Sequence, residues 1–173
     1  MLKILLYRDW LNIKKNIISL LFILFMLPML LYLLLSIPLS NIIELDLRYI
    51  NWSAPGIWVT SAGLIAFCNS ILRLKKIKYE TDQLATLLKT PLTNADILLS
   101  NIITSTLLGL FQLIISLILT TLLNGENLTF AELFLILLQM VPMINFLAIL
   151  GTFWGNFLQN SFSIVCMILL VFL

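Results

Sequence analysis

Residues 73–101 read R-L-K-K-I-K-Y-E-T-D-Q-L-A-T-L-L-K-T-P-L-T-N-A-D-I-L-L-S-N, a charged island between two long apolar runs. This island holds half of the ten Lys and Arg residues in the chain: Arg73, Lys75, Lys76, Lys78 and Lys89. A basic loop between membrane helices marks the cytoplasmic side of a membrane protein. The stretch therefore predicts a bundle of membrane helices with a cytoplasmic loop over residues 73–96.

The composition supports the same class. The 173 residues are 61% hydrophobic and 10% charged, whereas soluble domains carry about 25% charged residues. A water-exposed fold of this size could not bury so much apolar surface. We expect one all-α transmembrane domain over residues 1–173, in an integral membrane protein that binds no nucleic acid.

The residue types argue against several chemistries. The chain has no His, which removes His-based acid–base catalysis and His metal sites. Cys68 and Cys166 both lie in apolar runs and form no metal or redox spacing. We therefore expect no catalytic residue, no metal and no cofactor.

Apolar runs predict the spans. Four are long enough to cross a membrane: residues 17–39, 54–72, 97–123 and 133–157. A fifth run, residues 161–173, is shorter than the roughly 20 residues that a spanning helix needs, so we interpret it as the start of a truncated fifth span. Pro28 predicts a kink in the first run, and Pro142 an interruption of the fourth.

Residues 1–16 predict an amphipathic helix in the membrane interface. Its apolar positions recur at helical spacing: Leu2, Leu5, Leu6, Trp10 and Ile13. An ordinary basic flank of the first span is the alternative. Trp52 and Trp58 bracket the start of the second span, as interface anchors do.

Charge placement predicts the topology. With a cytoplasmic N-terminus, the inside segments carry nine of the ten basic residues, and the outside loops carry only Arg48.

The spans contain no Asp, Glu, Lys or Arg, which argues against an ion-coupled transporter. Their polar side chains favour hydrogen bonds between helices, with a substrate path as the alternative. The candidates for that path are Trp58, Asn69 and Gln112. Gly151 and Gly155 have the G-x-x-x-G spacing of helix dimers, which is a weak signal.

The island also predicts a short helix. Thr81 and Asp82 can cap its start, and Pro91 disfavours helix at the residue before it. One face then carries Leu84, Leu87 and Leu88. A two-turn helix is unstable alone in water, so it must pack on the membrane spans or on a partner. Thr93 and Asp96 form a capping box that starts the third span.

The island resembles a known family. The pattern Glu80-Thr81 … Leu87-Leu88-x-Thr90-Pro91-Leu92-Thr93 … Asp96-Ile97-Leu98-Leu99 is similar to the cytoplasmic loop signature of ABC transporter permeases of the second export type. Two further stretches, Ala54-Pro55-Gly56-Ile57 and Leu150-Gly151 … Gly155-Asn156 … Asn160-Ser161, look like that family's second span and its turn between the fourth and fifth spans. The chain departs from the family pattern at Asp82, Ala85 and Ser100-Asn101.

The resemblance implies six spans, a second permease subunit (identical or different) and a cytoplasmic ATP-binding subunit. It also implies a coupling helix that docks on that subunit, formed here by Glu80, Thr81, Asp82, Leu84, Leu87, Leu88 and Pro91. The chain has no G-x-x-x-x-G-K-[ST] phosphate loop and would hydrolyse nothing itself. A membrane scaffold subunit and, with less support, a lipid-modifying enzyme remain as alternatives.

Overall fold

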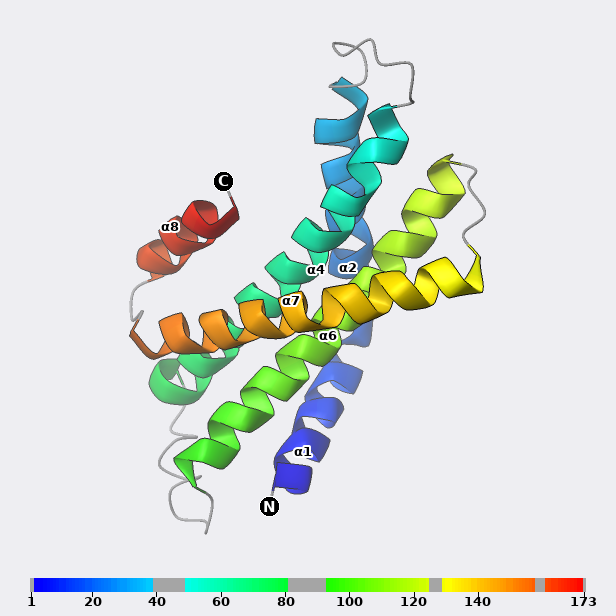
Figure 1. Ribbon diagram of the computed structural model, residues 1–173. Helices are drawn as coiled ribbons and strands as arrows, with labels where there is room; N and C mark the ends of the chain where they lie inside the picture. Colours follow the sequence, from blue (N-terminus) through cyan, green and yellow to red (C-terminus); the bar gives the residue numbers. More distant parts are fainter. Residues whose placement is uncertain (1, 39–48, 81–92, 125–128, 158–160, 173) are drawn as a thin grey trace.

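The computed structural model (Figure 1) describes residues 2–38, 49–80, 93–124, 129–157 and 161–172. All regular structure in these ranges is helical, so the all-α prediction is confirmed. The elements are α1 (Leu2–Lys15), α2 (Ile17–Leu31), η1 (Tyr32–Ser36), α4 (Tyr49–Lys75), η2 (Lys76–Glu80), α6 (Asn94–Asn124), α7 (Phe130–Phe157) and α8 (Ser161–Phe172). The π-helical segments η1 and η2 continue α2 and α4.

Among the described residues, four helices are long and apolar enough to cross a membrane: Ile17–Leu34, Ser53–Lys78, Asn94–Leu123 and Phe130–Phe157. They match the four predicted runs. The fifth run forms α8, which is only 12 residues long.

Two predicted features of the spans differ from the structure. The second span was expected to end at residue 72, but the helix continues through η2 to Glu80. Hydropathy marks the edge of the apolar run rather than the helix end, because Lys and Arg stems let a helix project beyond the hydrocarbon. The expected interruption at Pro142 is absent, since α7 is one helix. In a membrane helix, neighbouring groups can satisfy the backbone carbonyl that a proline leaves free.

Capping boxes start two of the long helices. At α6, the Thr93 N–H donates to Asp96 Oδ2 over 3.2 Å, and the Asp96 N–H donates to Thr93 Oγ1 over 3.2 Å. This box was predicted and is confirmed. At α7, the Thr129 N–H donates to Glu132 Oε2 over 2.8 Å, and the Glu132 N–H donates to Thr129 Oγ1 over 3.4 Å. Each box satisfies two backbone or side-chain groups at an exposed helix end.

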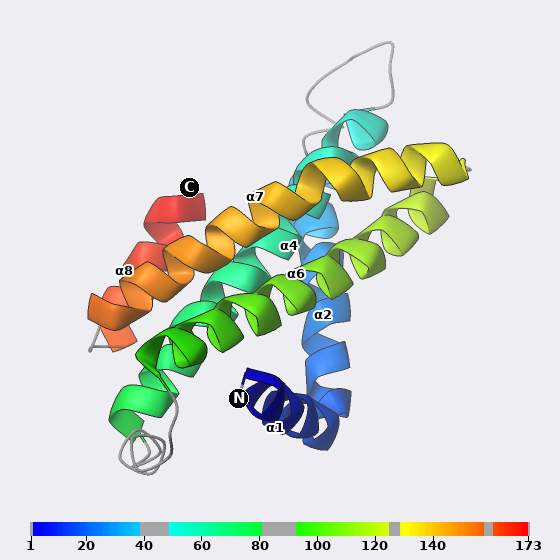
Figure 2. The ribbon, with the colours of Figure 1, turned by 60° about the horizontal axis from the view of Figure 1, so that its bottom comes forward.

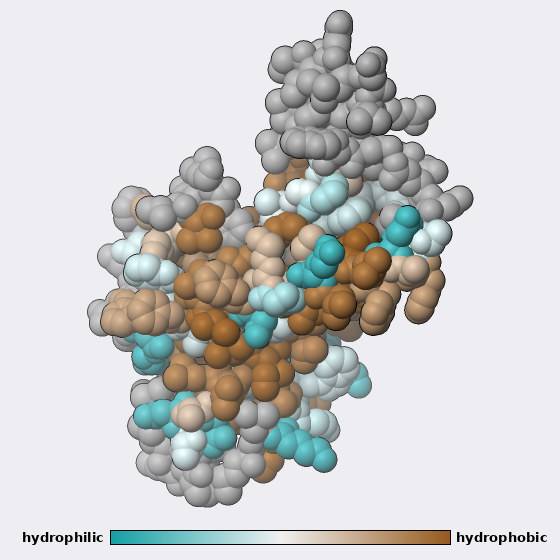
Figure 3. Space-filling model, in the orientation of Figure 1, coloured by the Kyte–Doolittle hydropathy of each residue, from teal (hydrophilic) through white to brown (hydrophobic). Residues whose placement is uncertain are grey.

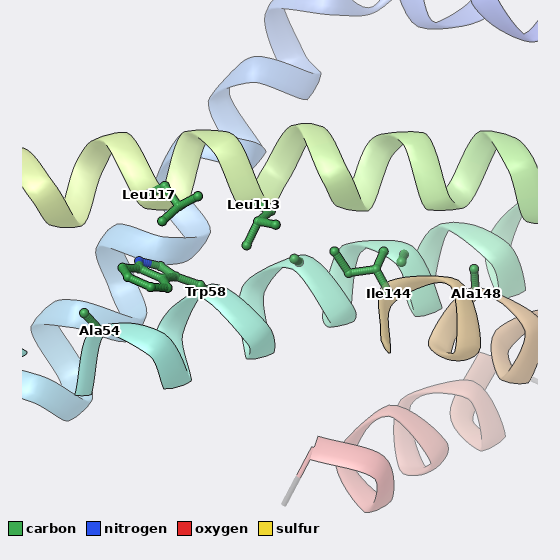
Figure 4. Close-up of a cluster of buried hydrophobic side chains, with 8 residues drawn as sticks. Ala54, Trp58, Leu113, Leu117, Ile144 and Ala148 are labelled. Carbon is green, nitrogen blue, oxygen red and sulfur yellow. The ribbon is translucent and has the colours of Figure 1, made fainter. Parts of the chain in front are cut away.

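Helix α4 is the centre of the bundle, with α6 and α7 packed along it (Figures 1 and 2). The largest apolar cluster joins the three helices through Ala54, Trp58, Ala62, Ala66, Leu113, Leu117, Ile144 and Ala148 (Figure 4). A second cluster, of Phe67, Ile71 and Ile164, holds α8 against α4. The core thus follows α4 from one end to the other.

Glycines allow the close approach of these helices. A Cβ on Gly109 of α6 would lie 2.6 Å from Ile144 Cγ2 and 2.9 Å from Ala66 Cβ. A Cβ on Gly151 of α7 would lie 2.6 Å from the backbone oxygen of Phe67 in α4. Such distances leave no room for any side chain. The G-x-x-x-G pair of α7 therefore packs on α4 of the same chain, because Gly155 also lies against α4 at Ile71.

The outer faces are apolar. In α2, Ile18 is 84% exposed and Phe22 62% exposed, and large apolar side chains of α7 such as Phe134 and Phe146 are also exposed. Apolar side chains cover much of the middle of the face in Figure 3. Four membrane-length helices that turn such side chains outward indicate a membrane protein, in which lipid or another membrane subunit covers these faces.

The glycine contacts predict a matched pair of effects. Gly151→Ala should lower the free energy of unfolding by about 1–3 kcal/mol, because the new methyl group meets the α4 backbone, which cannot shift like a side chain. Gly56→Ala is the control, since no atom lies within 4 Å of a Cβ there. Thermal unfolding in detergent micelles measures both. Equal melting temperatures for the two variants would contradict the proposed packing of α7 on α4.

Candidate functional site at the basic end of the bundle

Four segments meet at one end of the bundle: α1, the last turns of α4 with η2, the first turn of α6 and the end of α7. Leu5 of α1, Ile77 of η2 and Ile97 of α6 form a buried cluster. Lys78 Nζ donates to Asn156 Oδ1 of α7 over 2.6 Å. All described Lys and Arg residues belong to α1 or to residues 73–78, so we name this region the basic end.

The centre of the basic end is an ion pair between Asp9 of α1 and Arg73 of α4. Asp9 is 5% exposed and the Arg73 side chain 15% exposed. Ser100 of α6 completes the group: its hydroxyl donates to Asp9 Oδ2 over 3.0 Å, and its backbone oxygen accepts from Arg73 Nη1 over 3.2 Å. One network thus joins three helices, and we call it the Asp9 latch.

The latch satisfies a charge that would otherwise be costly. Removing an ionised carboxylate from water costs several kcal/mol unless a partner and hydrogen bonds compensate it. Arg73 supplies the opposite charge, and Ser100 supplies a donor to the same carboxylate oxygen. Helix α1 therefore has one defined position against α4 and α6, because sliding it along them would separate Asp9 from both partners.

The apolar stripe of α1 faces the protein more than expected. Leu5 is buried against Ile77 and Ile97, and Leu6, Trp10 and Ile13 line a cavity between α1, α2 and α6. Trp10 nevertheless stays 63% exposed, close to Tyr7 at 64%, and Ile4 is 72% exposed. The chain turns at Asn16, so α1 lies across the foot of α2 (Figure 2).

A series of polar contacts crosses the α4–α6 interface. Trp58 Nε1 donates to Thr120 Oγ1 over 2.6 Å, and Asn69 Nδ2 donates to Ser105 Oγ over 2.8 Å. Between these two levels, the hydroxyls of Ser61 and Ser116 lie 2.7 Å apart. Because the helices are antiparallel, residues progressively later in α4 meet residues progressively earlier in α6. For Asn69 and Ser105, the prediction of an interhelical bond is confirmed.

The three candidate path residues have different environments in the described structure. Trp58 is 8% exposed and packs between α4 and α6 (Figure 4), so it is a core residue rather than the predicted interface anchor. Gln112 is fully buried and donates only to Ser116 of its own helix, over 3.3 Å. Asn69 borders a cavity at the basic end. The residue types alone do not predict which of these three side chains is buried in the core and which borders a cavity.

A second buried amide has a different role. Asn101 of α6 donates through Nδ2 to the backbone oxygen of Ser70 in α4 over 3.1 Å and to Thr152 Oγ1 in α7 over 3.2 Å. It therefore joins three helices, whereas Gln112 bonds within one. In both residues the side-chain carbonyl oxygen is buried and has no hydrogen-bond partner among the described residues.

Most predicted coupling residues, Thr81 through Pro91, lie outside the described residues. Of that set, only Glu80 is placed, as the last residue of η2 at the basic end. The residues that sequence reasoning missed are Asp9 and Arg73. The visible signals were one acidic residue among the basic residues of the first helix and one arginine directly after an apolar run. Neither signal identifies the partner. Comparisons of the chain with models of known protein families, with curated proteins and with solved structures found no match.

The Asp9 latch predicts a specific loosening of α1. Asp9→Asn leaves Arg73 buried without its counter-ion. The free energy that holds α1 against the bundle should fall by up to about 3–5 kcal/mol. A spin label at position 4, an exposed site on α1, should become mobile in electron paramagnetic resonance spectra. The control Arg8→Gln removes the other ion pair of Asp9. The Arg8 side chain is partly exposed, so this pair is worth at most about 1 kcal/mol. A label that stays immobile in Asp9→Asn would refute the latch.

The two buried amides predict opposite outcomes. Asn101→Leu breaks two bonds to other helices and should cost about 0.6–1.7 kcal/mol for each. Gln112→Met removes a buried carbonyl that has no partner and should leave stability unchanged or raised. Denaturant unfolding in mixed micelles compares the two variants. A larger loss for Gln112→Met would mean that its carbonyl has an essential partner in the assembled protein.

Proposed function

We propose that the chain is the membrane-spanning permease subunit of an ATP-driven ABC exporter, with its basic end in the cytoplasm. The observation that carries this proposal is the loop signature over residues 80–99. Its described flanks support it, because Glu80 ends η2 and Thr93 caps α6, and the two elements border one cavity of about 330 Å³ with Asn156 of α7. The described residues on either side of the loop thus both lie at the basic end.

The distribution of charge supports the orientation. The described Lys and Arg residues gather at the end where α1 and η2 meet, and the positive-inside rule assigns such an end to the cytoplasm. The N-terminus is cytoplasmic in this proposal, in the cytoplasmic membrane of a bacterium. A soluble ATP-binding subunit would then meet the coupling helix there.

In the proposed mechanism, ATP-driven closure of the partner moves the coupling helix. The movement reaches α4 directly, because α4 and η2 are continuous in the chain. It reaches α1 through the Asp9 latch and α6 through the capping box of Thr93 and Asp96. The basic end would therefore move as a unit and rock the bundle against a second permease subunit.

The substrate would pass between the two permease subunits. Helix α4 is a poor wall for that path, because α6 and α7 cover it and 56% of its apolar window is buried. The corresponding share is 17% for α2 and also for α7, so these two helices present much larger uncovered faces. We therefore assign the path to one of these two faces rather than to Trp58 or Gln112.

The test is a variant of the coupling helix. Leu84→Asp with Leu87→Asp places two charges on the predicted apolar face and should abolish recovery of a stoichiometric ATPase from mild-detergent extracts. The control, Ala85→Asp with Thr86→Asp, adds the same charge away from that face and should retain the ATPase. Quantitative mass spectrometry and an ATPase assay give the readout, and membrane insertion is checked by fractionation.

Two results would overturn the proposal. A monodisperse wild-type protein that carries no nucleotide-hydrolysing partner would favour a scaffold subunit. Full ATPase recovery by the Leu84 and Leu87 variant would remove the coupling role from this face.

A further inference from the structure

Two adjoining cavities lie between α1, α2, α4 and α6 at the basic end. The first, of about 330 Å³, has a mixed lining in which apolar side chains alternate with the polar residues Asp9, Asn12, Asn16, Asn69, Arg73 and Lys76. The second, of about 400 Å³, is almost wholly apolar and includes Leu6, Trp10, Ile17, Leu21, Leu107 and Phe111. They share the wall residues Ile13, Leu20, Thr104 and Leu108, so the two form one continuous cleft with a polar and an apolar end.

The polar end is suited to an anion. Its lining carries two cationic side chains, Arg73 and Lys76, against one carboxylate, Asp9. The Asp9 carboxylate already accepts from Arg73 and Ser100 within the latch. The side-chain amides of Asn12 and Asn16 add neutral N–H donors to the same cavity. A phosphate group is the anion that such a mixture of cationic and amide donors recognises.

The apolar end is suited to a hydrocarbon chain. Phe111 and Leu107 of α6 form one wall, and Trp10 of α1 is opposite. These side chains remain 45%, 59% and 63% exposed, so a chain entering from the bilayer would remove their surface from water. The position of the cleft beside α1, at the charged boundary of the apolar helices, matches the depth at which a lipid headgroup joins its acyl chains.

We propose that this cleft binds one anionic phospholipid, with its phosphate at the polar end and an acyl chain along α6. Basic pockets between membrane helices on the cytoplasmic side bind lipid headgroups in this way. The lipid would fill the space between α1 and α6 and reinforce the latch. This site requires neither the ATPase nor export, so it goes beyond the proposed function and can fail independently of it.

The first test varies the headgroup contact. Delipidated protein in detergent is titrated with phosphatidylglycerol or with phosphatidylcholine of the same acyl chains, and native mass spectrometry counts bound lipid. Wild type should prefer phosphatidylglycerol. Lys76→Gln should weaken phosphatidylglycerol binding about fivefold, the value of one basic contact near a membrane surface. Lys75→Gln, the matched control, removes the same charge from a residue that does not line the cleft and should leave binding unchanged.

The second test fills the apolar end. Leu20→Trp narrows the wall that both cavities share and should abolish retention of either lipid. Ile18→Trp adds the same ring at an 84% exposed position outside the cleft and should have no effect. Thermal unfolding confirms that each variant is folded, and Leu108→Phe replaces Leu20→Trp if the latter is not.

Three results would overturn the site. Equal losses in the Lys75 and Lys76 variants would indicate diffuse surface attraction rather than a cleft. Equal binding of the two lipids would remove the anionic preference. Displacement of phosphatidylglycerol by millimolar inorganic phosphate would mean that the polar end binds free phosphate and that the apolar end contributes nothing.

Discussion

The close approach of α6 and α7 to α4 is the constraint on which the rest of the structure depends. Lipid tails are as apolar as leucine side chains, so burial of apolar surface provides little drive for helices to associate within a membrane. Dispersion contacts and hydrogen bonds must provide it instead. Both need short distances, which Gly109, Gly151 and Ala66 permit by presenting almost no side chain. The hydrogen bonds of Trp58 and Asn69 then fix the register of α4 against α6.

The hydroxyl groups on these helices explain why so polar an interface is tolerated. Thr104, Ser116 and Thr120 each donate to the backbone oxygen four residues earlier. Those bonds form whether or not the neighbouring helix is in place, so the helix carries few unsatisfied donors before it packs. The hydroxyl oxygens can then accept from a partner helix, as Thr120 does from Trp58. Packing adds bonds without first exposing unpaired groups to lipid.

Local patterns predicted the helices but not their partners. Apolar runs gave the four long helices, and one S/T-x-x-D/E spacing gave the start of α6. The same spacing at Thr129 and Glu132 starts α7. The roles of Asp9 and Arg73 could not be read this way, because 64 positions separate them and each fits a solvated surface equally well. The G-x-x-x-G pair is a similar case. Its spacing predicts a flat helix surface but does not identify the helix that packs there.

The Asp9 latch and the cleft both lie at the basic end of the bundle. Within the bilayer an ionic pair gains strength from the low dielectric but pays for desolvation, so the favourable site is the boundary, where water reaches one side. Asp9 and Arg73 lie at the charged end of the apolar helices, and the shared wall of the cleft lies directly beside them. Asp9 offsets part of the Arg73 charge, so the attraction between Arg73 and a phosphate bound there would be reduced. Lys76 lines the same cavity and adds a second positive charge to it.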